Sequence, residues 1–418
     1  MTHSPALFVR RLRFNAGSKL SAEIIGRALQ FLLAYLAQRS LGPAGYGDFT
    51  YALSVGIVLS PLTDLGMQLI VTREIARNPA QADRLTGTGL ILKLALAALA
   101  GLILIAIGLA RPIELQIATI VLGLALIFNS FVEFFGYALR GLQRVEFDAA
   151  FTLVLRLLTV GLGLGALSLN LGLGGLIAAY FISGLTTAVI SYLILSHRFF
   201  RPNLKIDWAA NWQLLKSALP LGGAIVFSIL YTRMAIFLLD ALQGSTAVGL
   251  YGVAQKLTEP LAIFPAAILA AVFPAFSQAL TGDIDRAKWL RRRTVWLLLG
   301  AGLAIALAGL NGGPWLINFL YRDQYAGSVS ALQLLAVATI FTFVNYALTH
   351  FLVALNLQRW LMLFNLGLLL LNAALCLTFI PPLGPAGAAL AVLLCEGVLS
   401  TLCIITLVRH PLHRFRSQ

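Results

Sequence analysis

Charged residues are scarce in this chain of 418 residues: they make up 11% of it, whereas 59% of the residues are hydrophobic. Soluble domains carry about 25% charged residues, so this composition excludes a soluble globular protein. Acidic residues are the rarest, with 16 Asp and Glu against 30 Lys and Arg. The resulting charge of +14 does not indicate nucleic acid as a partner, because the bases are spread over every second loop.

Catalytic and metal-binding motifs are also missing. The three cysteines lie in the last two apolar stretches without C-x-x-C spacing, which argues against a zinc ribbon or a dithiol centre. The chain has no Walker loop, no H-E-x-x-H and no G-x-S-x-G. The sequence therefore predicts a protein that is not an enzyme and that needs no cofactor.

Long apolar stretches fill the chain instead, and a spanning helix needs about 20 such residues. We expect twelve membrane spans, at 18–39, 47–71, 86–110, 115–138, 151–170, 175–196, 217–240, 249–275, 294–311, 329–353, 361–380 and 386–408. Lys and Arg outside these spans collect in alternate loops and in both tails. Short basic loops stay in the cytoplasm, so both termini are expected there, in an all-α integral membrane protein.

The two halves of the chain resemble each other. Leu171-Gly172-Leu173-Gly174-Gly175 has a counterpart in Leu383-Gly384-Pro385-Ala386-Gly387, and Gly45-Tyr46-Gly47 has one in Gly249-Leu250-Tyr251-Gly252. We therefore predict two parallel six-helix repeats, 1–196 and 217–418. Between them lies a cytoplasmic linker, 197–216, predicted to be an amphipathic helix. Parallel repeats are common in alternating-access transporters, with the substrate path between them.

A few charges fall inside the predicted spans, where they are costly and normally face the bundle interior or water. Arg27 and Arg233 occupy equivalent places in the first helix of each half, and a pair of guanidinium groups suits a cluster of anionic oxygens. Ion pairs that only hold helices together, Glu23–Arg27 and Lys256–Glu259, are the alternative. We predict substrate contacts for Arg27, Arg233, Lys93 and Lys256. The candidates for ion coupling or gating are Glu23, Asp48, Asp240 and Glu259.

Four segments carry a resemblance to a known family. They are Leu41-Gly42-Pro43-Ala44-Gly45-Tyr46-Gly47-Asp48-Phe49 with Thr72-Arg73-Glu74-Ile75-Ala76-Arg77, then Phe319-Leu320-Tyr321-Arg322-Asp323-Gln324-Tyr325, and Leu383-Gly384-Pro385-Ala386-Gly387. Together they resemble the Wzx-type polysaccharide-biosynthesis, or O-antigen, flippases of the MOP exporter superfamily. Arg322 stands where that family usually has glycine.

This resemblance implies a multi-pass protein of the bacterial inner membrane, with two six-helix lobes forming a V around a cationic cavity. It implies transfer of a polyprenyl-diphosphate-linked oligosaccharide, of the kind used for lipopolysaccharide, from the cytoplasmic to the outer leaflet. Expected partners are that lipid-linked substrate, membrane lipids and polysaccharide polymerase or assembly proteins. A proton, a sodium ion or the membrane potential would drive the cycle.

Three other functions are compatible with a polytopic membrane protein. A MATE-like, cation-coupled multidrug exporter would favour an acid-rich cavity, whereas the charges inside these spans lean basic. A membrane glycosyltransferase or O-antigen ligase would need a large outer loop, and the longest here, about 312–328, is short. A scaffold protein would not need charges inside its spans.

Overall fold

The protein is helical over most of the part of the chain that its structure describes. The computed structural model describes the backbone of residues 5–410. The side chains of residues 5–25 and those of Arg27, Glu114, Leu221, Ala224 and Thr281 lie outside the described residues. Contacts divide the chain into two compact units: unit 1 comprises Met1–Leu41 and Tyr51–Ile229, and unit 2 comprises Gly42–Thr50 and Leu230–Gln418.

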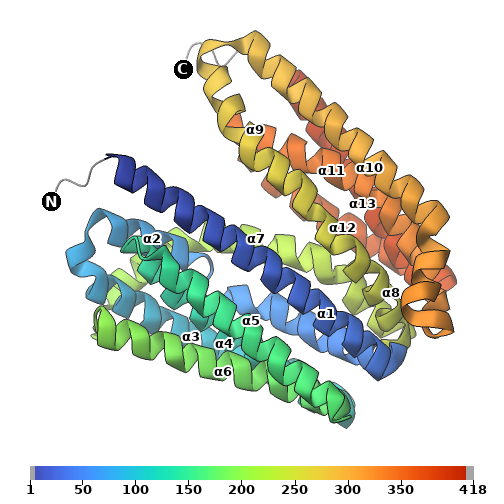
Figure 1. Ribbon diagram of the computed structural model, residues 1–418, viewed down its shortest axis with the longest axis horizontal. Helices are drawn as coiled ribbons and strands as arrows, with labels where there is room; N and C mark the ends of the chain where they lie inside the picture. Colours follow the sequence, from blue (N-terminus) through green and yellow to red (C-terminus); the bar gives the residue numbers. More distant parts are fainter. Residues whose placement is uncertain (1–4, 411–418) are drawn as a thin grey trace. The chain divides into compact units, whose positions relative to one another are not determined.

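Unit 1 is built around one central helix, α4. Its helices are α1 (Pro5–Leu59, shared with unit 2), α2 (Met67–Arg77), α3 (Ala82–Leu109), α4 (Ile113–Gly141), α5 (Val145–Ser168), α6 (Gly172–Arg198) and the start of α7 (Trp208–Gln243) (Figure 1). Helices α2, α3, α5 and α6 all pack against α4. Its aromatic residues Phe134 and Phe135 are buried at their centre, next to Phe151 of α5 and Leu195 of α6.

Unit 2 has a similar centre in α11. Its further helices are α8 (Ser245–Thr258), α9 (Ile263–Gly282), α10 (Ile284–Tyr321), α11 (Val329–Ala354), α12 (Gln358–Leu383) and α13 (Pro385–Arg409). The ring of Phe351 of α11 lies 4.5 Å from that of Phe276 of α9, centre to centre and tilted by 47°, inside a core that also contains Phe343. Helix α11 packs against α8, α9, α10 and α13.

The second span of each half is broken by a short 3-10 helix that contains a proline. Helix α1 gives way to η1 (Ser60–Thr63) at Pro61, and α8 gives way to η3 (Glu259–Ala262) at Pro260. Proline lacks the amide proton that would continue the helix, so both breaks follow from the sequence. Pro220, by contrast, lies inside an unbroken α7. The first break is sharper, with positive φ at Leu65 and Gly66 and a bend of 40° before α2.

Glycines of the repeated segment make close helix packing possible inside unit 2. A side chain on Gly249 of α8 would overlap the carbonyl oxygen of Pro43, and one on Gly47 would overlap that of Ser245. Glycine is needed at both positions because the backbones approach too closely for a Cβ atom. The two glycine segments that resemble each other in sequence therefore pack directly against one another.

The predicted amphipathic linker is not a separate helix. Residues 201–207 have no regular secondary structure, and α7 then runs without interruption from Trp208 into the span. Unit 1 also extends past the linker to Ile229. The domain boundaries at 197–216 stay a prediction.

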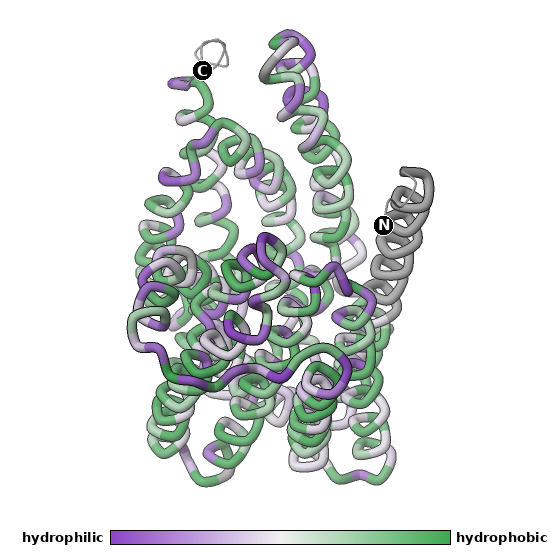
Figure 2. The backbone as a smooth tube through the Cα atoms, turned by 90° about the vertical axis from the view of Figure 1, so that its left-hand side faces the viewer, coloured by the Kyte–Doolittle hydropathy of each residue, from purple (hydrophilic) through white to green (hydrophobic). Residues whose placement is uncertain are grey.

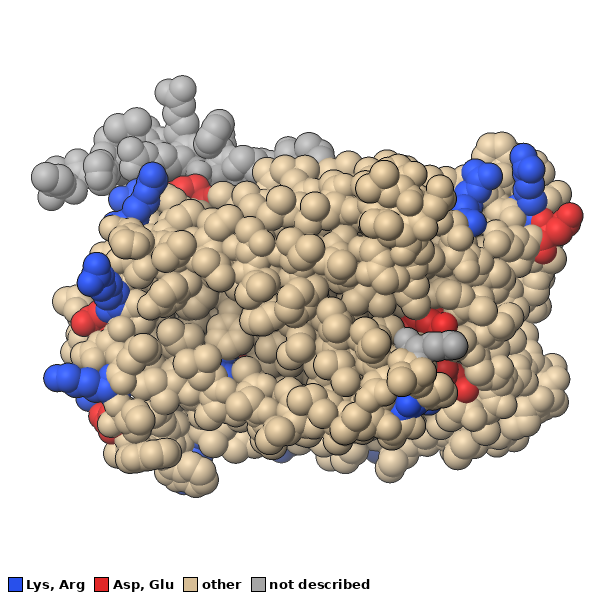
Figure 3. Space-filling view, turned by 90° about the horizontal axis from the view of Figure 1, so that it is seen from below, with Lys and Arg blue, Asp and Glu red and all other residues tan. Residues whose placement is uncertain are grey.

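The surface and the helix composition are those of an all-α integral membrane protein. In the described part of the chain, nine helical stretches are long and apolar enough to cross a bilayer, or ten if the bent α1–α2 pair counts as one span. One of these stretches, 284–354, contains both α10 and α11. Hydrophobic residues follow the helices and hydrophilic ones gather at their ends (Figure 2). On one face, charged side chains lie mainly near the two ends and leave most of the middle uncharged (Figure 3). The count of twelve spans, the V shape and the cytoplasmic termini stay predictions.

Candidate functional site

A pocket inside unit 2 contains Arg233 and Glu259, two of the charged residues that sequence analysis placed inside the predicted spans. Its volume is about 310 Å³, and its walls come from α7, α8, η3, α11 and α13. Arg233 enters from α7 and Glu259 from η3, and Glu396 enters from α13. Apolar side chains such as Leu335 and Phe343 of α11 complete the lining. The pocket therefore combines charged groups with an apolar wall.

Arg233 has hydrogen-bond donors that the protein does not use. Its side chain is 17% exposed, and its Nη2 lies 3.9 Å from Oε1 of Glu259. The buried Nε has no hydrogen-bond partner among the described residues, and neither has the buried hydroxyl of Tyr231 in the same pocket. Glu259 also accepts a bond from Lys256 Nζ at 3.4 Å, so this carboxylate is shared between two bases. A buried donor without a partner costs free energy, which an anion bound here would recover.

Glu396 is a functional candidate that sequence analysis missed. Its Oε2 accepts a bond of 2.7 Å from Asn345 Nδ2, and Ser400 donates to Asn345 Oδ1, also at 2.7 Å. The amide is thus held by both neighbours and keeps the carboxylate in place at the pocket wall. The signal in the sequence was a single acidic residue within the apolar run Leu393-Leu394-Cys395-Glu396-Gly397.

Lys93 lies in the packed interior of unit 1, at the break between η1 and α2. Its Nζ donates to Thr63 Oγ1 at 3.0 Å, lies 3.6 Å from Asp64 Oδ2 and sits 4.9 Å from the ring centre of Phe131. Asp64 Oδ1 in turn accepts a bond from the Gly66 amide. The side chain of Lys93 is fully buried, so a direct contact with substrate would require this cluster to open.

The remaining predicted residues are spread over both units. The side chains of Arg27 and Glu23 lie outside the described residues, so the proposed pair of arginines stays a prediction. Asp48 is half-buried and Asp240 is buried, both in unit 2. Of the eight predicted residues, the structure brings Arg233, Lys256 and Glu259 together, and the roles assigned to all eight stay predictions.

Solved structures with the same fold are membrane transporters. An inward-facing multidrug resistance MATE transporter of the MOP superfamily aligns over 96% of this chain and 99% of its own, at 18% identity and a TM-score of 0.77. The lipid II flippase MurJ, in an inward closed conformation, aligns over 95% and 89%, at 13% identity and a TM-score of 0.76. A mutant of a Vibrio cholerae MATE transporter aligns over 96% and 95%, at 16% identity and a TM-score of 0.55. The fold is that of a transporter of the MOP superfamily.

Residues 12–280 match the family of polysaccharide biosynthesis proteins, and this match covers more than half of the chain. The protein belongs to that family. Residues 220–378 also match the MatE family. No curated protein matches the chain. The protein is thus a multi-pass membrane transporter and not an enzyme, as predicted from the sequence.

Proposed function

We propose that the protein is a flippase that moves polyprenyl-diphosphate-linked oligosaccharide from the cytoplasmic to the outer leaflet of the bacterial inner membrane. Precursors of O-antigen and lipopolysaccharide belong to this substrate class. The observation that carries the proposal is the Arg233 pocket, with two unpartnered donors on Tyr231 and Arg233 in an apolar wall. Membership of the polysaccharide biosynthesis family supports the same substrate.

The diphosphate binds in this pocket by displacing Glu259 from Arg233. The existing contact is long, at 3.9 Å, and Glu259 retains Lys256 when Arg233 turns to the ligand. Guanidinium groups bind phosphate oxygens through two parallel bonds, so Nε and one Nη atom of Arg233 suit the diphosphate. The polyprenyl tail stays in lipid, because burying its apolar surface in the protein is unnecessary for transfer.

Membrane potential and a coupled cation drive the cycle. Movement of negative charge out of an inside-negative cell releases about 2.3 kcal/mol per charge per 100 mV. Glu396 is the acidic residue best placed to take up a proton or sodium ion, because it lines the same pocket as Arg233, whereas Glu259 there is already shared between two bases. Uptake of a cation there after release of the diphosphate neutralises the carboxylate and so favours the return of the empty carrier.

Flipping in proteoliposomes tests this function. A fluorescent polyprenyl-diphosphate oligosaccharide is reconstituted with the protein, and a membrane-impermeant reductant reports the fraction exposed outside. Arg233→Ala is expected to slow flipping at least about tenfold, since a hydrogen bond to a charged group contributes about 1.5–3 kcal/mol. Arg359→Ala, which removes an exposed arginine stacked on Trp360 in the same unit, serves as the control.

If folded Arg233→Ala protein flips the lipid at the rate of the wild-type protein, this pocket does not hold the diphosphate. Failure of the wild-type protein to flip any lipid-linked sugar, together with export of a cationic dye, would show a multidrug exporter instead.

A further inference from the structure

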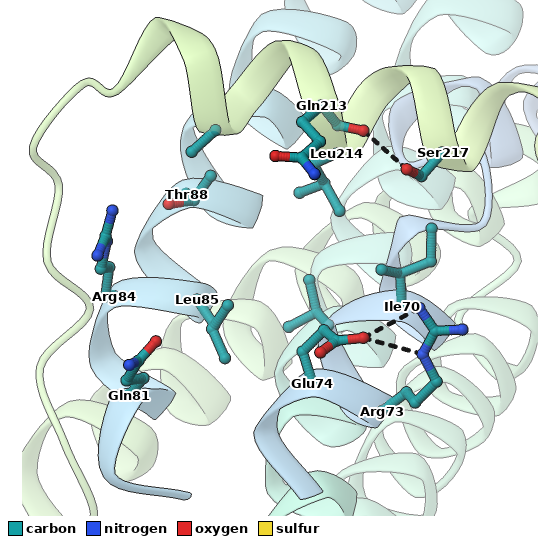
Figure 4. Close-up of a pocket in the computed structure, with 12 residues that line it drawn as sticks. Ile70, Arg73, Glu74, Gln81, Arg84, Leu85, Thr88, Gln213, Leu214 and Ser217 are labelled. Carbon is teal, nitrogen blue, oxygen red and sulfur yellow. Dashed lines mark hydrogen bonds and ion pairs between the residues drawn. The ribbon is translucent and has the colours of Figure 1, made fainter. Parts of the chain in front are cut away.

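A second pocket lies within unit 1, at the predicted cytoplasmic ends of its helices. Its volume is about 390 Å³. Its walls come from α2, from η2 (Pro79–Gln81) with the first turns of α3, and from the first turns of α7 (Figure 4). None of the residues assigned above to transport lines it. A different ligand must therefore be considered for this pocket.

Contacts between the linker and α3 hold the walls of this pocket in place. The Asn203 amide donates to a carbonyl oxygen in the first turn of α3, and a side chain on Gly87 would overlap the Asn203 backbone. Asp207 Oδ1 accepts a bond of 3.0 Å from the Ala210 amide and so caps α7, while its Oδ2 pairs with Arg84 at 3.2 Å. The pocket is thus formed by fixed elements and not by a loose side-chain arrangement.

The mouth of the pocket is rich in hydrogen-bond donors. Arg84 lies on its α3 wall and Arg73 on its α2 wall, with Gln213 above them on α7 (Figure 4). Arg73 pairs with Glu74 at 2.9 Å. Thr88 is only 8% exposed, and it lines the same pocket. Arg84 and Arg73 thus stand on opposite sides of the pocket, with Glu74 beside Arg73, while Thr88 and Gln213 line the space between them (Figure 4). This distribution of two bases against one carboxylate gives the mouth a positive balance that attracts an anionic headgroup.

The floor of the same pocket is apolar. Val71, Leu85 and Leu214 line it and belong to, or pack against, the core of unit 1. A polar mouth above an apolar floor matches a ligand with a charged head and a hydrocarbon part. A fully hydrated inorganic phosphate would gain nothing from this floor.

Helix α7 places the pocket at the surface of the bilayer. Ala210, Gln213, Leu214 and Ser217 line the pocket and recur at helical spacing, so one face of the helix belongs to it. Trp208 and Trp212 lie on another face and are 80% and 66% exposed. Exposed indole rings prefer the headgroup region of a membrane. The pocket therefore lies at the depth of phospholipid headgroups.

We propose that this pocket binds the phosphate headgroup of an anionic phospholipid of the surrounding bilayer. Arg73 and Arg84 attract the anionic headgroup from opposite sides of the mouth, Thr88 and Gln213 donate to its oxygens, and the first carbons of the acyl chains cover Leu85 and Leu214. The bound lipid fixes the start of α7, the helix that leads out of unit 1. This site is separate from the Arg233 pocket, so the proposal does not depend on which lipid is transported.

Native mass spectrometry of the detergent-purified full chain tests the site. Phosphatidylglycerol and phosphatidylcholine are added in parallel, and the number of retained lipids is measured against lipid concentration. The variant Arg73→Ala/Arg84→Ala is expected to bind phosphatidylglycerol about thirtyfold more weakly, the equivalent of about 1 kcal/mol for each arginine. Thr88→Val, which removes the hydroxyl at nearly constant volume, is expected to weaken binding about fivefold, or about 1 kcal/mol.

Matched controls separate this effect from loss of charge or of folding. Arg144→Ala/Arg359→Ala removes two exposed arginines outside the pocket, one of which pairs with Glu146 as Arg73 does with Glu74. This control and Arg233→Ala are expected to retain phosphatidylglycerol like the wild type. Arg73→Lys/Arg84→Lys is expected to restore most of the binding, which a merely unfolded protein would not do.

Three results would overturn the proposal. Equal retention of phosphatidylcholine and phosphatidylglycerol would show that the site does not select a lipid with a net negative charge. Equal loss of lipid from both double alanine variants would show only a general charge effect. Competition by inorganic phosphate at the same concentration as the lipid would show a site for a soluble anion instead.

Discussion

The buried ion pair at the break of the second span leads to a sharp prediction about stability. Lys93 is fully buried, and its partner Asp64 is nearly so, with 3.6 Å between Nζ and Oδ2. Lys93→Met keeps the length of the side chain but removes the ammonium group. Asp64, buried at the turn before α2, then loses the cation beside it, while Glu133 of α4 still interacts with it electrostatically. Breaking a buried pair on one side costs about 3–5 kcal/mol.

The partner substitution separates charge from local geometry. Asp64→Asn removes the negative charge but keeps Oδ1, the atom that accepts the bond of 2.8 Å from the Gly66 amide. This change is expected to cost less than Lys93→Met, because Glu133 still interacts electrostatically with Lys93. The double variant Lys93→Met/Asp64→Asn has no charge from either member of the pair. Its free energy of unfolding is expected to exceed that of Lys93→Met by about 2–3 kcal/mol.

Unfolding in mixed detergent micelles, followed by circular dichroism, measures all four proteins of this cycle. Lys288→Met removes a partly exposed lysine that pairs with Asp285, and it is expected to change stability by less than about 1 kcal/mol. If the losses in the free energy of unfolding of the two single variants simply add in the double variant, the interaction between Lys93 and Asp64 does not stabilise the broken span. A stable Lys93→Met protein that fails to flip lipid would then support the substrate contact predicted from sequence.

Three further predictions concern backbone geometry and pH. Gly249→Ala forces a Cβ atom against the Pro43 carbonyl and is expected to cost about 1–3 kcal/mol in the same assay, whereas Gly312→Ala, with open space around it, is expected to be nearly neutral. Arg322 has φ 56° and ψ −149°, a conformation that suits glycine, so Arg322→Gly is expected to stabilise by about 1 kcal/mol. The hydrogen bond from the Ala210 amide and the Arg84 guanidinium lower the pKa of Asp207. The Asp207 carboxylate therefore contributes to the docking of α7 above its usual pKa. This contribution is lost as the pH falls through the lowered pKa. Hydrogen exchange of the Ala210 amide, corrected for intrinsic rates, is expected to accelerate over that window in the wild type, and Asp207→Asn is expected to remove the pH dependence.

Hydropathy predicted much of the fold, and the positions of two prolines explain where the second span of each half breaks. The apolar runs locate the helices, and Pro61 and Pro260 mark both broken spans, because a missing amide proton acts locally. Pro220 shows the limit of that argument, since packing keeps α7 continuous there. The departure at Arg322 was also visible in the sequence, because the usual glycine of the family fits the positive φ that the structure shows.

Side-chain partners were much harder to predict than helices. A helix that is apolar on all sides gives no sign of its rotation about its own axis, so the sequence does not tell which charges meet. Lys93 and Asp64 are brought together only by the turn after η1, and Glu396 lines the pocket of Arg233 only because α13 packs beside α8 and α11. Local rules contain no information about these distances.

The difference between Lys93 and Arg233 follows from how many of their donors the protein already uses. Lys93 is surrounded by a hydroxyl, a carboxylate and an aromatic ring, so its charge is compensated without any ligand. Arg233 has one long contact to Glu259 and a buried Nε without a partner in the described part of the chain, beside the unpartnered hydroxyl of Tyr231. Burying either charge inside a membrane costs free energy. Binding of an anion lowers this cost only for Arg233, because its donors are not already used by the protein. Among the predicted bases whose side chains are described, Arg233 is therefore the one whose geometry favours a role in binding the transported diphosphate.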